Sequence, residues 1–241
     1  MKTLFLAAAI AISLCVAAGA QSVQISSKKV TYTRKKPISE YKKTFTIEYP
    51  KVKASSSALS RRIENAISYS SILDLDLKGE LGEYQWLEEA DYEVKYNQNG
   101  LLSIELRMNG SGAYPSGSSK IVVVDTRTGN RVRPAAAFRD LAGLVAMINR
   151  SLKKEIAKAV VEIRSDRANE EPNPERLFVN SKFKIRDLDG FSVDEKGVTF
   201  VYDYGFPHVI QALQPDGVFF FNWRDMRPFI RPTGLLARFT R

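Results

Sequence analysis

Apolar and polar residues alternate in several stretches of the chain, and this period of two is typical of strands with one buried face. The clearest case is 102–108, where Leu, Ile, Leu and Met occupy the even positions. Asn99-Gly100 comes directly before it and favours a hairpin with the alternating stretch 92–96. The small-residue segment 110–117 follows and is interpreted as a loop, and the apolar run 121–124 predicts the next strand.

Two stretches show the spacing of an amphipathic helix instead. The serines at 55–57 are candidate N-caps for a helix that continues to about Ser71. Its apolar stripe is Leu59, Ile63 and Ile67. A longer helix follows Pro134, and each stripe must lie against a sheet because it cannot stay in water. The apolar positions of the longer helix are Leu141, Leu144, Val145, Ile148, Leu152, Ile156 and Val160.

The ends of the chain return to strand patterns. A polar lead-in at 21–27 precedes strands from Val30 and at 45–49, and 165–176 is polar enough to predict an exposed loop. Late strands are expected at 183–185, 191–193, 198–204 and 218–221, with regular structure ending at 232–234.

These elements predict an α+β fold, an antiparallel β-sheet with two main helices packed on it. Residues 21–241 are long enough to bury a sizeable core, and we expect them to form one domain. A division into an N-terminal half, 28–98, and a C-terminal half, 99–241, is the alternative.

The first twenty residues have the pattern of a secretory signal peptide. A lysine at position 2 precedes an apolar run from 4 to 18 and the small-residue exit Ala18-Gly19-Ala20. Cys15 is expected to leave with this peptide, because Leu14 stands where the lipoprotein peptidase needs a small residue. No other apolar run is long enough to span a bilayer, so we expect an extracytoplasmic protein, periplasmic or secreted, without a membrane span after signal removal.

The chain carries a formal charge of +9, which raises the question of nucleic acid. Its basic residues are scattered, and no predicted helix has a continuous basic face with interleaved aromatic residues. Nucleic acid is therefore not an expected partner of an exported chain. Anionic polymers of the cell envelope are the expected counterpart, and a solvated basic surface with no partner is the alternative.

Catalytic and metal motifs are scarce. His208 is the only histidine, no cysteine follows the leader, and 110–112 does not match the G-x-S-x-G elbow. Zinc ligands are therefore lacking, and neither a metal nor a cofactor is expected. Asp187, Asp189 and Asp194 lack the spacing of a calcium loop and indicate Asp-rich turns.

Two carboxylates facing each other in a cleft are harder to exclude by sequence. Glu105, Asp203 and Glu195 stand at expected strand ends, but nothing in their spacing marks a pair. We therefore expect no enzyme, and keep a carboxylate-dependent hydrolase acting on cell-wall glycan as the alternative.

Aromatic residues cluster late in the chain and could present a stacking surface. Alternate members of a strand face opposite sides, so one set forms core and the other is available to a ligand. Together with the small-residue loop, the candidate ligand-binding residues are Tyr114, Pro115, Phe206, His208 and Trp223.

Several short motifs together resemble a known bacterial family. They are 99–104 (NGLLSI), 112–115 (GAYP), 125–130 (DTRTGN), Ala137-Phe138 before the long helix, Tyr49-Pro50 and 63–65 (IEN). The combination is similar to the extracytoplasmic domain of unknown function at the C-terminus of the RsiV-type lysozyme-sensing anti-sigma factors, which also occurs beside polysaccharide deacetylase domains. Tyr114 stands where the family loop often has His, and Ser111 where a second Gly is common.

The resemblance implies an α+β fold and a sensing or binding module near peptidoglycan, and it brings no accepted catalytic residues. We therefore expect an exported non-enzymatic binding or sensing module of the cell envelope, for peptidoglycan-type glycan or an envelope protein. A lysozyme-binding or inhibitor-like protein is disfavoured, because lysozyme is commonly basic and this chain is basic too.

Overall fold

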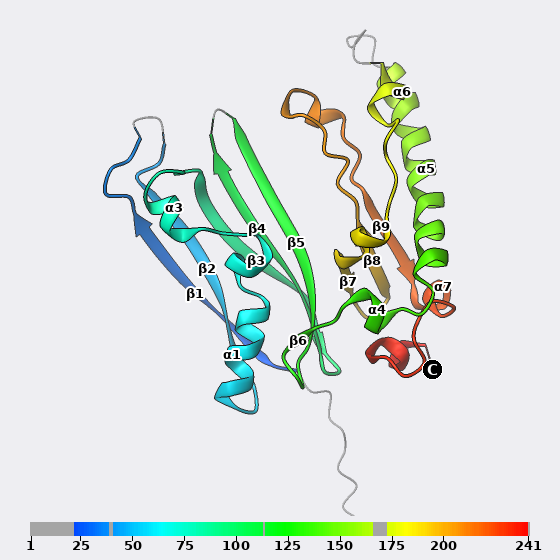
Figure 1. Ribbon diagram of the computed structural model, residues 1–241, viewed down its shortest axis with the longest axis horizontal. Helices are drawn as coiled ribbons and strands as arrows, with labels where there is room; N and C mark the ends of the chain where they lie inside the picture. The colour runs from blue at the N-terminus through cyan, green and yellow to red at the C-terminus, as the bar shows by residue number, and fades with distance from the viewer. Residues whose placement is uncertain (1–21, 39–40, 113, 166–172, 241) are drawn as a thin grey trace, which may run out of the picture.

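The computed structural model describes residues 22–38, 41–112, 114–165 and 173–240. Six strands form the larger sheet and lie side by side in chain order (Figure 1). All neighbours are antiparallel except β2 and β3, which pair in parallel at Thr46–Glu89 and Ile47–Ala90. The strands are β1 (Gln24–Thr33), β2 (Thr44–Lys53), β3 (Leu87–Gln98), β4 (Leu101–Ser111), β5 (Pro115–Asp125) and β6 (Asn130–Arg131).

Short helices connect β2 with β3, because a parallel pair requires a crossover. They are α1 (Ser57–Ala66), α2 (Tyr69–Ile72) and α3 (Leu77–Leu81). The Ser56 side chain caps α1 by accepting a hydrogen bond from the Leu59 N–H at 3.2 Å, within the predicted serine cluster. Ile63 and Ile67 of the predicted stripe are fully buried, but α1 ends at Ala66, so the predicted continuation to about Ser71 is wrong and the separate helix α2 follows.

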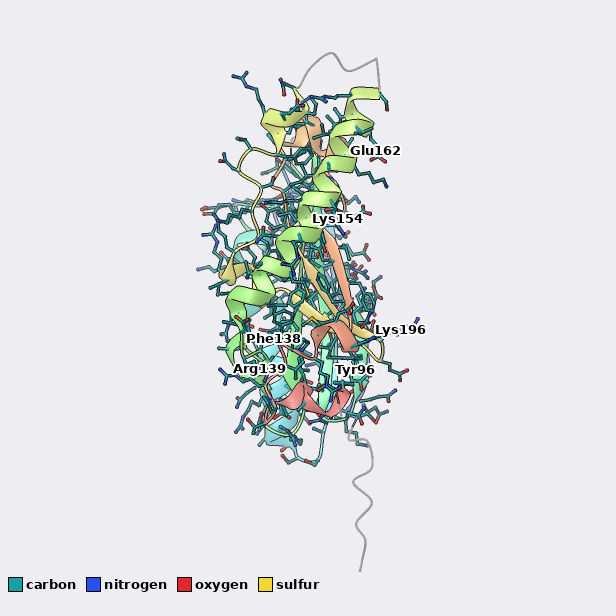
Figure 2. All side chains as sticks on the ribbon, turned by 90° about the vertical axis from the view of Figure 1, so that its right-hand side faces the viewer. Tyr96, Phe138, Arg139, Lys154, Glu162 and Lys196 are labelled. Carbon is teal, nitrogen blue, oxygen red and sulfur yellow. The ribbon has the colours of Figure 1, made fainter. Side chains whose placement is uncertain are left out.

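A second sheet of three antiparallel strands follows later in the chain. Its strands are β7 (Phe191–Val193), β8 (Gly197–Val201) and β9 (Val218–Asn222). The predicted long helix is α5 (Leu141–Ser165), and it lies against this sheet, with Leu144, Ile148 and Leu152 buried. Figure 2 shows α5 along the length of the molecule, with Lys154 and Glu162 on its exposed side. The short elements are α4 (Pro134–Ala137), α6 (Pro174–Leu177), η1 (Ile185–Asp189), η2 (His208–Leu213), α7 (Trp223–Met226) and η3 (Leu235–Phe239).

The two faces of β4 and β5 serve two different cores. Leu102 and Val122 face the helices α1 and α2, in a cluster with Ile63 and Ile67. Leu101 and Val123 face the other way, into a cluster that contains α5 and the second sheet. The predicted α+β class is therefore confirmed. The structure differs in having two sheets, and the β4–β5 hairpin of the larger sheet separates two hydrophobic cores.

The hairpin between β3 and β4 forms where Asn99-Gly100 predicted it. Both residues have positive φ, 54° and 73°, as the two central residues of a type I′ turn require. The six-stranded sheet thus contains strands from both expected halves of the chain, 28–98 and 99–241.

Four local predictions are corrected by the structure. The polar lead-in is wrong, because β1 begins at Gln24 and pairs through its backbone with β2, which requires no apolar side chains. The predicted loop 110–117 is mostly strand, since β4 and β5 are already paired at Ser111 and Pro115, next to the turn. The expected strand at 183–185 does not form, and the 3-10 helix η1 begins at Ile185. Regular structure was expected to end at 232–234, but the 3-10 helix η3 follows.

Within the described ranges, no helix combines the length and the apolar character that a membrane crossing requires. The expected signal peptide, residues 1–20, and most of the expected loop 165–176 lie outside the described residues.

Candidate binding site at the hairpin tip

Tyr114, at the turn of the β4–β5 hairpin, contacts His208 of the 3-10 helix η2, which lies between β8 and β9 in the chain. The two rings are stacked, with centroids 4.7 Å apart and planes 24° apart. The His208 Nε2 also lies 3.1 Å from the Pro115 carbonyl oxygen, so that nitrogen carries the proton and donates. Three of the five predicted binding residues therefore lie together, joined across two sheets.

His208 reaches the hairpin because the chain leaves the second sheet between β8 and β9. This excursion, 202–217, carries η2 to the tip of the β4–β5 hairpin (Figure 1). At its base the Tyr202 N–H donates to the Gly217 carbonyl at 2.8 Å. On its side the Tyr204 hydroxyl donates to Glu155 Oε2 of α5 at 2.6 Å, and burial, with this carboxylate, raises the pKa of Tyr204.

Trp86 is a further aromatic residue at this tip that sequence reasoning missed. Its indole Nε1–H donates to the Ser116 hydroxyl at 2.9 Å, so Trp86 is fixed on the hairpin. A Cβ at Gly110 would lie 2.2 Å from the Trp86 carbonyl oxygen, so only glycine allows this close approach. Trp86 is partly exposed, and neighbouring Tyr84 is 69% exposed. We call Trp86, Tyr114, Ser116 and His208 the hairpin-tip cluster.

The segment before Trp86 is held by a buried glutamine. Gln85 has a φ of 31°, and its Nε2 donates to the carbonyls of Lys36 and Gly82, each at 2.7 Å. Its Oε1 accepts a hydrogen bond from the Ile38 N–H at 2.9 Å. In the sequence, the available signal for this site was the segment 83–86, where two aromatic residues alternate with two polar ones.

Phe206 and Trp223 occupy different positions from the other candidates. Phe206 packs on Phe178 and Tyr204 under the excursion, with ring centroids 5.3 and 6.0 Å apart. Trp223 is 9% exposed, stacks on Phe239 at 4.2 Å, and donates its indole N–H to the Asp194 and Glu195 carbonyls. Phe206 packs on the small cluster of Ala159, Ile163 and Phe178 at the end of α5, whereas Trp223 belongs to the core of the second sheet.

The acids considered for hydrolysis have separate engagements. Glu105 pairs with Lys95 at 3.1 Å, Glu195 accepts from the Gln98 amide at 3.4 Å, and Asp203 accepts from the Gly205 N–H at 2.8 Å. In the described ranges no three His, Cys, Asp or Glu side chains gather as metal ligands. Two of the aspartates predicted to form turns do so. Asp187 caps η1 by accepting from the Lys184 N–H, and Asp194 accepts from the N–H groups of Lys196 and Gly197.

A groove runs between β5 and the second sheet, below the hairpin tip. It consists of two adjoining hollows of about 410 and 310 Å³ that share Lys120, Ile121, Asp187 and Gly190. We call it the inter-sheet groove. Its wider end has arginines from β6 and the following residues, and Arg131 there donates to the Ala66 carbonyl at 2.9 Å.

The fold is that of the DUF3298 proteins, the domain found at the C-terminus of RsiV-type proteins. A DUF3298 family member from Bacteroides fragilis NCTC 9343 superposes with a TM-score of 0.60 and 13% identity, over 92% of this chain and 98% of that one. A DUF3298 family protein from Pseudomonas aeruginosa PAO1 gives 0.56 and 12%, over 88% and 96%. The family resemblance drawn from the short motifs is thereby confirmed at the level of fold. No protein-family model and no curated protein sequence matches the chain.

Proposed function

We propose that this chain is an exported, non-enzymatic binding or sensing module of the bacterial cell envelope, which binds peptidoglycan-type glycan at the hairpin-tip cluster. The observation that carries the proposal is the stack of Tyr114 on His208 at the end of the β4–β5 hairpin, beside Trp86. The leader pattern of residues 1–20 supports export, and the resemblance of the short motifs to the extracytoplasmic RsiV-type domain supports a role in the envelope.

Aromatic rings at a rigid tip suit the apolar faces of sugar rings. Tyr114 is 61% exposed although it stacks on His208, so one face of its ring is available to a ligand. Tyrosine and tryptophan combine a large apolar surface with a polar end, which favours a wet, partly apolar ligand. The cluster is positioned by strand pairing and two side-chain hydrogen bonds, so little ordering is needed on binding.

Polar groups beside the rings can orient a sugar hydroxyl. The His208 Nε2 is engaged by Pro115, which leaves Nδ1 as an acceptor for a ligand, and the Ser116 hydroxyl accepts from Trp86 and retains its own proton to donate. Binding sites of this kind typically combine apolar walls with a few such placed polar groups. The net positive charge adds long-range attraction to an anionic envelope polymer.

Cosedimentation with purified peptidoglycan sacculi tests the proposal. We expect the leader-free protein to pellet with the sacculi, and Tyr114→Ala to reduce the pelleted fraction several-fold. The matched control is Phe220→Ala, which removes an exposed aromatic ring on β9, and we expect it to pellet like the parent. Absence of pelleting at low salt, or equal losses in both variants, would contradict the proposal.

The same incubation tests the non-enzymatic part of the proposal. Glu105 forms an ion pair with Lys95, Glu195 accepts from Gln98, and Asp203 accepts from the Gly205 N–H. Since these acids have separate partners, we expect no release of soluble reducing sugar. Release that is lost in a Glu105→Gln or Asp203→Asn variant would support the hydrolase instead.

A further inference from the structure

The outer edge of β5, on the side away from β4, is open over its middle. In an antiparallel pair, successive residues turn their backbone N–H and C=O alternately toward and away from the partner strand. The Val123 carbonyl accepts from the Val132 N–H at 2.8 Å, so Val123 faces away from β4. The register of β4 with β5 is continuous, and every second residue therefore faces the same way. These residues are Pro115, Gly117, Ser119 and Ile121.

Both ends of this row are occupied by groups of the same chain. At the hairpin tip the Pro115 carbonyl is bonded by His208, and at the other end Val123 is bonded by the residue after β6. β6 is a strand of only two residues, Asn130 and Arg131, seated on the same edge. Among the described residues, none hydrogen-bonds the outward backbone groups of the three residues between. Within the part of the chain that the structure describes, the outward backbone groups of Gly117, Ser119 and Ile121 are thus free, and they lie between two positions, Pro115 and Val123, that are already hydrogen-bonded.

The inter-sheet groove lies along this free run. Ser119, Lys120 and Ile121 line its narrower part, and the edge continues through Val122 and Val123 into its wider part. On the opposite side the wall comes from the second sheet and η1, so this edge of β5 faces a hollow that has a second wall. Unsatisfied edge strands in native proteins are usually covered or blunted, and this one faces a preformed hollow.

We infer that the inter-sheet groove binds an extended polypeptide segment of an envelope protein, which pairs with β5 as an added strand. The chemistry that selects a peptide is the repeat of N–H and C=O at Gly117, Ser119 and Ile121, because an extended peptide presents complementary groups at the same two-residue spacing. β6 shows that this edge accepts a strand, and the added peptide continues its line.

The groove also specifies which side chains the peptide carries. In the wider hollow Ile72 and Val122 favour an apolar residue, while Arg131 and Arg133 in the same hollow favour an acidic one. In the narrower hollow Asp187 and Asp203 stand at the wall, which favours polar residues at the alternate positions. A segment of alternating apolar and polar residues, without proline at the pairing positions, meets both requirements.

This site is separate from the glycan site, and the outward row of β5 meets the glycan site only at Pro115, whose carbonyl is bonded by His208. A suitable probe is a capped six-residue peptide of alternating valine and threonine, compared with the same peptide N-methylated at the amides that would pair. In amide NMR spectra of the leader-free protein, we expect the parent peptide to shift and protect the amides of Gly117, Ser119 and Ile121. Equal effects of both peptides, or no effect of either, would overturn the inference.

Two variants separate this site from the glycan site. Ser119→Pro removes the central outward N–H at a position where the edge tolerates proline, as it does at Pro115, and we expect peptide affinity to fall about tenfold. Its matched control is Ser118→Ala, at a residue whose backbone pairs with Met108 of β4 and which does not line the groove, and we expect it to bind like the parent. Ser119→Pro should still pellet with sacculi, and Tyr114→Ala should still bind the peptide. Protection of the β5 amides that rises with protein concentration alone would identify a second copy as the occupant and overturn the inference.

Discussion

Tyr114 and His208 form an aromatic stack that joins the β4–β5 hairpin of the larger sheet to the η2 excursion of the smaller one. The hydrogen bond from His208 to the Pro115 carbonyl fixes the same junction through the backbone. This junction between the hairpin and η2 therefore builds the hairpin-tip cluster.

His208→Ala is expected to release the excursion from the hairpin without unfolding the chain. The stack and one hydrogen bond together are worth about 1–2 kcal/mol at a partly exposed site. Hydrogen exchange should therefore become faster in residues 206–214 and around Tyr114, with little change elsewhere. Val209→Ala, at the exposed neighbouring position of the same helix, is the control and should leave both segments unchanged. Unaltered exchange in His208→Ala would show that the junction does not depend on this ring.

Gly110→Ala is expected to disturb the tip directly. The added Cβ would lie 2.2 Å from the Trp86 carbonyl oxygen, so the segment that carries Trp86, just before β3, must move. We expect a loss of about 1–3 kcal/mol of unfolding free energy, as for other overpacked sites, and weaker pelleting with sacculi. Gly112→Ala is the matched control, because a Cβ there meets nothing within 4 Å. Equal urea midpoints for the two variants would contradict the close approach.

Arg34 and Glu80 are expected to hold the N-terminal strands to α3. Arg34 is 1% exposed and donates to Glu80 Oε2 at 3.1 Å and to the Leu87 carbonyl at 2.7 Å. Removal of one partner of a buried pair leaves the other charge uncompensated, so Arg34→Ala should cost about 3–5 kcal/mol. Arg61→Ala, on the exposed side of α1, should change stability by less than about 0.5 kcal/mol. Denaturant unfolding of the two variants checks the difference.

The buried Tyr204 hydroxyl, which donates to Glu155, is expected to make the free energy of unfolding fall at alkaline pH. Burial raises the pKa of Tyr204 above the ordinary value of about 10, so the folded state holds this proton more tightly than the unfolded state. The contribution is therefore complete below about pH 10 and is lost as the pH rises toward the folded pKa. Tyr204→Phe should lose stability at pH 7 and show a shallower decline between about pH 9 and 11. Parallel declines in the two proteins would contradict this assignment.

Periodicity was sufficient for the elements that bury apolar side chains. The stripe of α5, the alternation of β4 and the Asn99-Gly100 turn all follow from local rules, and each is found where it was predicted. The first residues of β1, 24–27, and the outer half of the β4–β5 hairpin were missed, whereas the strand predicted from Val30 is the second half of β1. The missed residues pair through backbone groups and carry small or polar side chains, so they leave no apolar period in the sequence.

The site was predictable only in part for a similar reason. Tyr114, Pro115 and His208 were chosen as exposed aromatic and loop residues, and the structure brings them into contact. Trp223 has the same composition signal but is enclosed by Phe239 and two carbonyls. Trp86 reaches the tip through a buried glutamine and a glycine in another strand, which no local pattern encodes.

NMR titration of the labelled, leader-free protein with a soluble disaccharide fragment of peptidoglycan tests the central claim most directly. The account predicts saturable shifts of the Trp86 indole and the Tyr114 and His208 ring signals, with no cleavage of the fragment. Shifts confined to other parts of the molecule, or none at concentrations that saturate known glycan-binding modules, would contradict it.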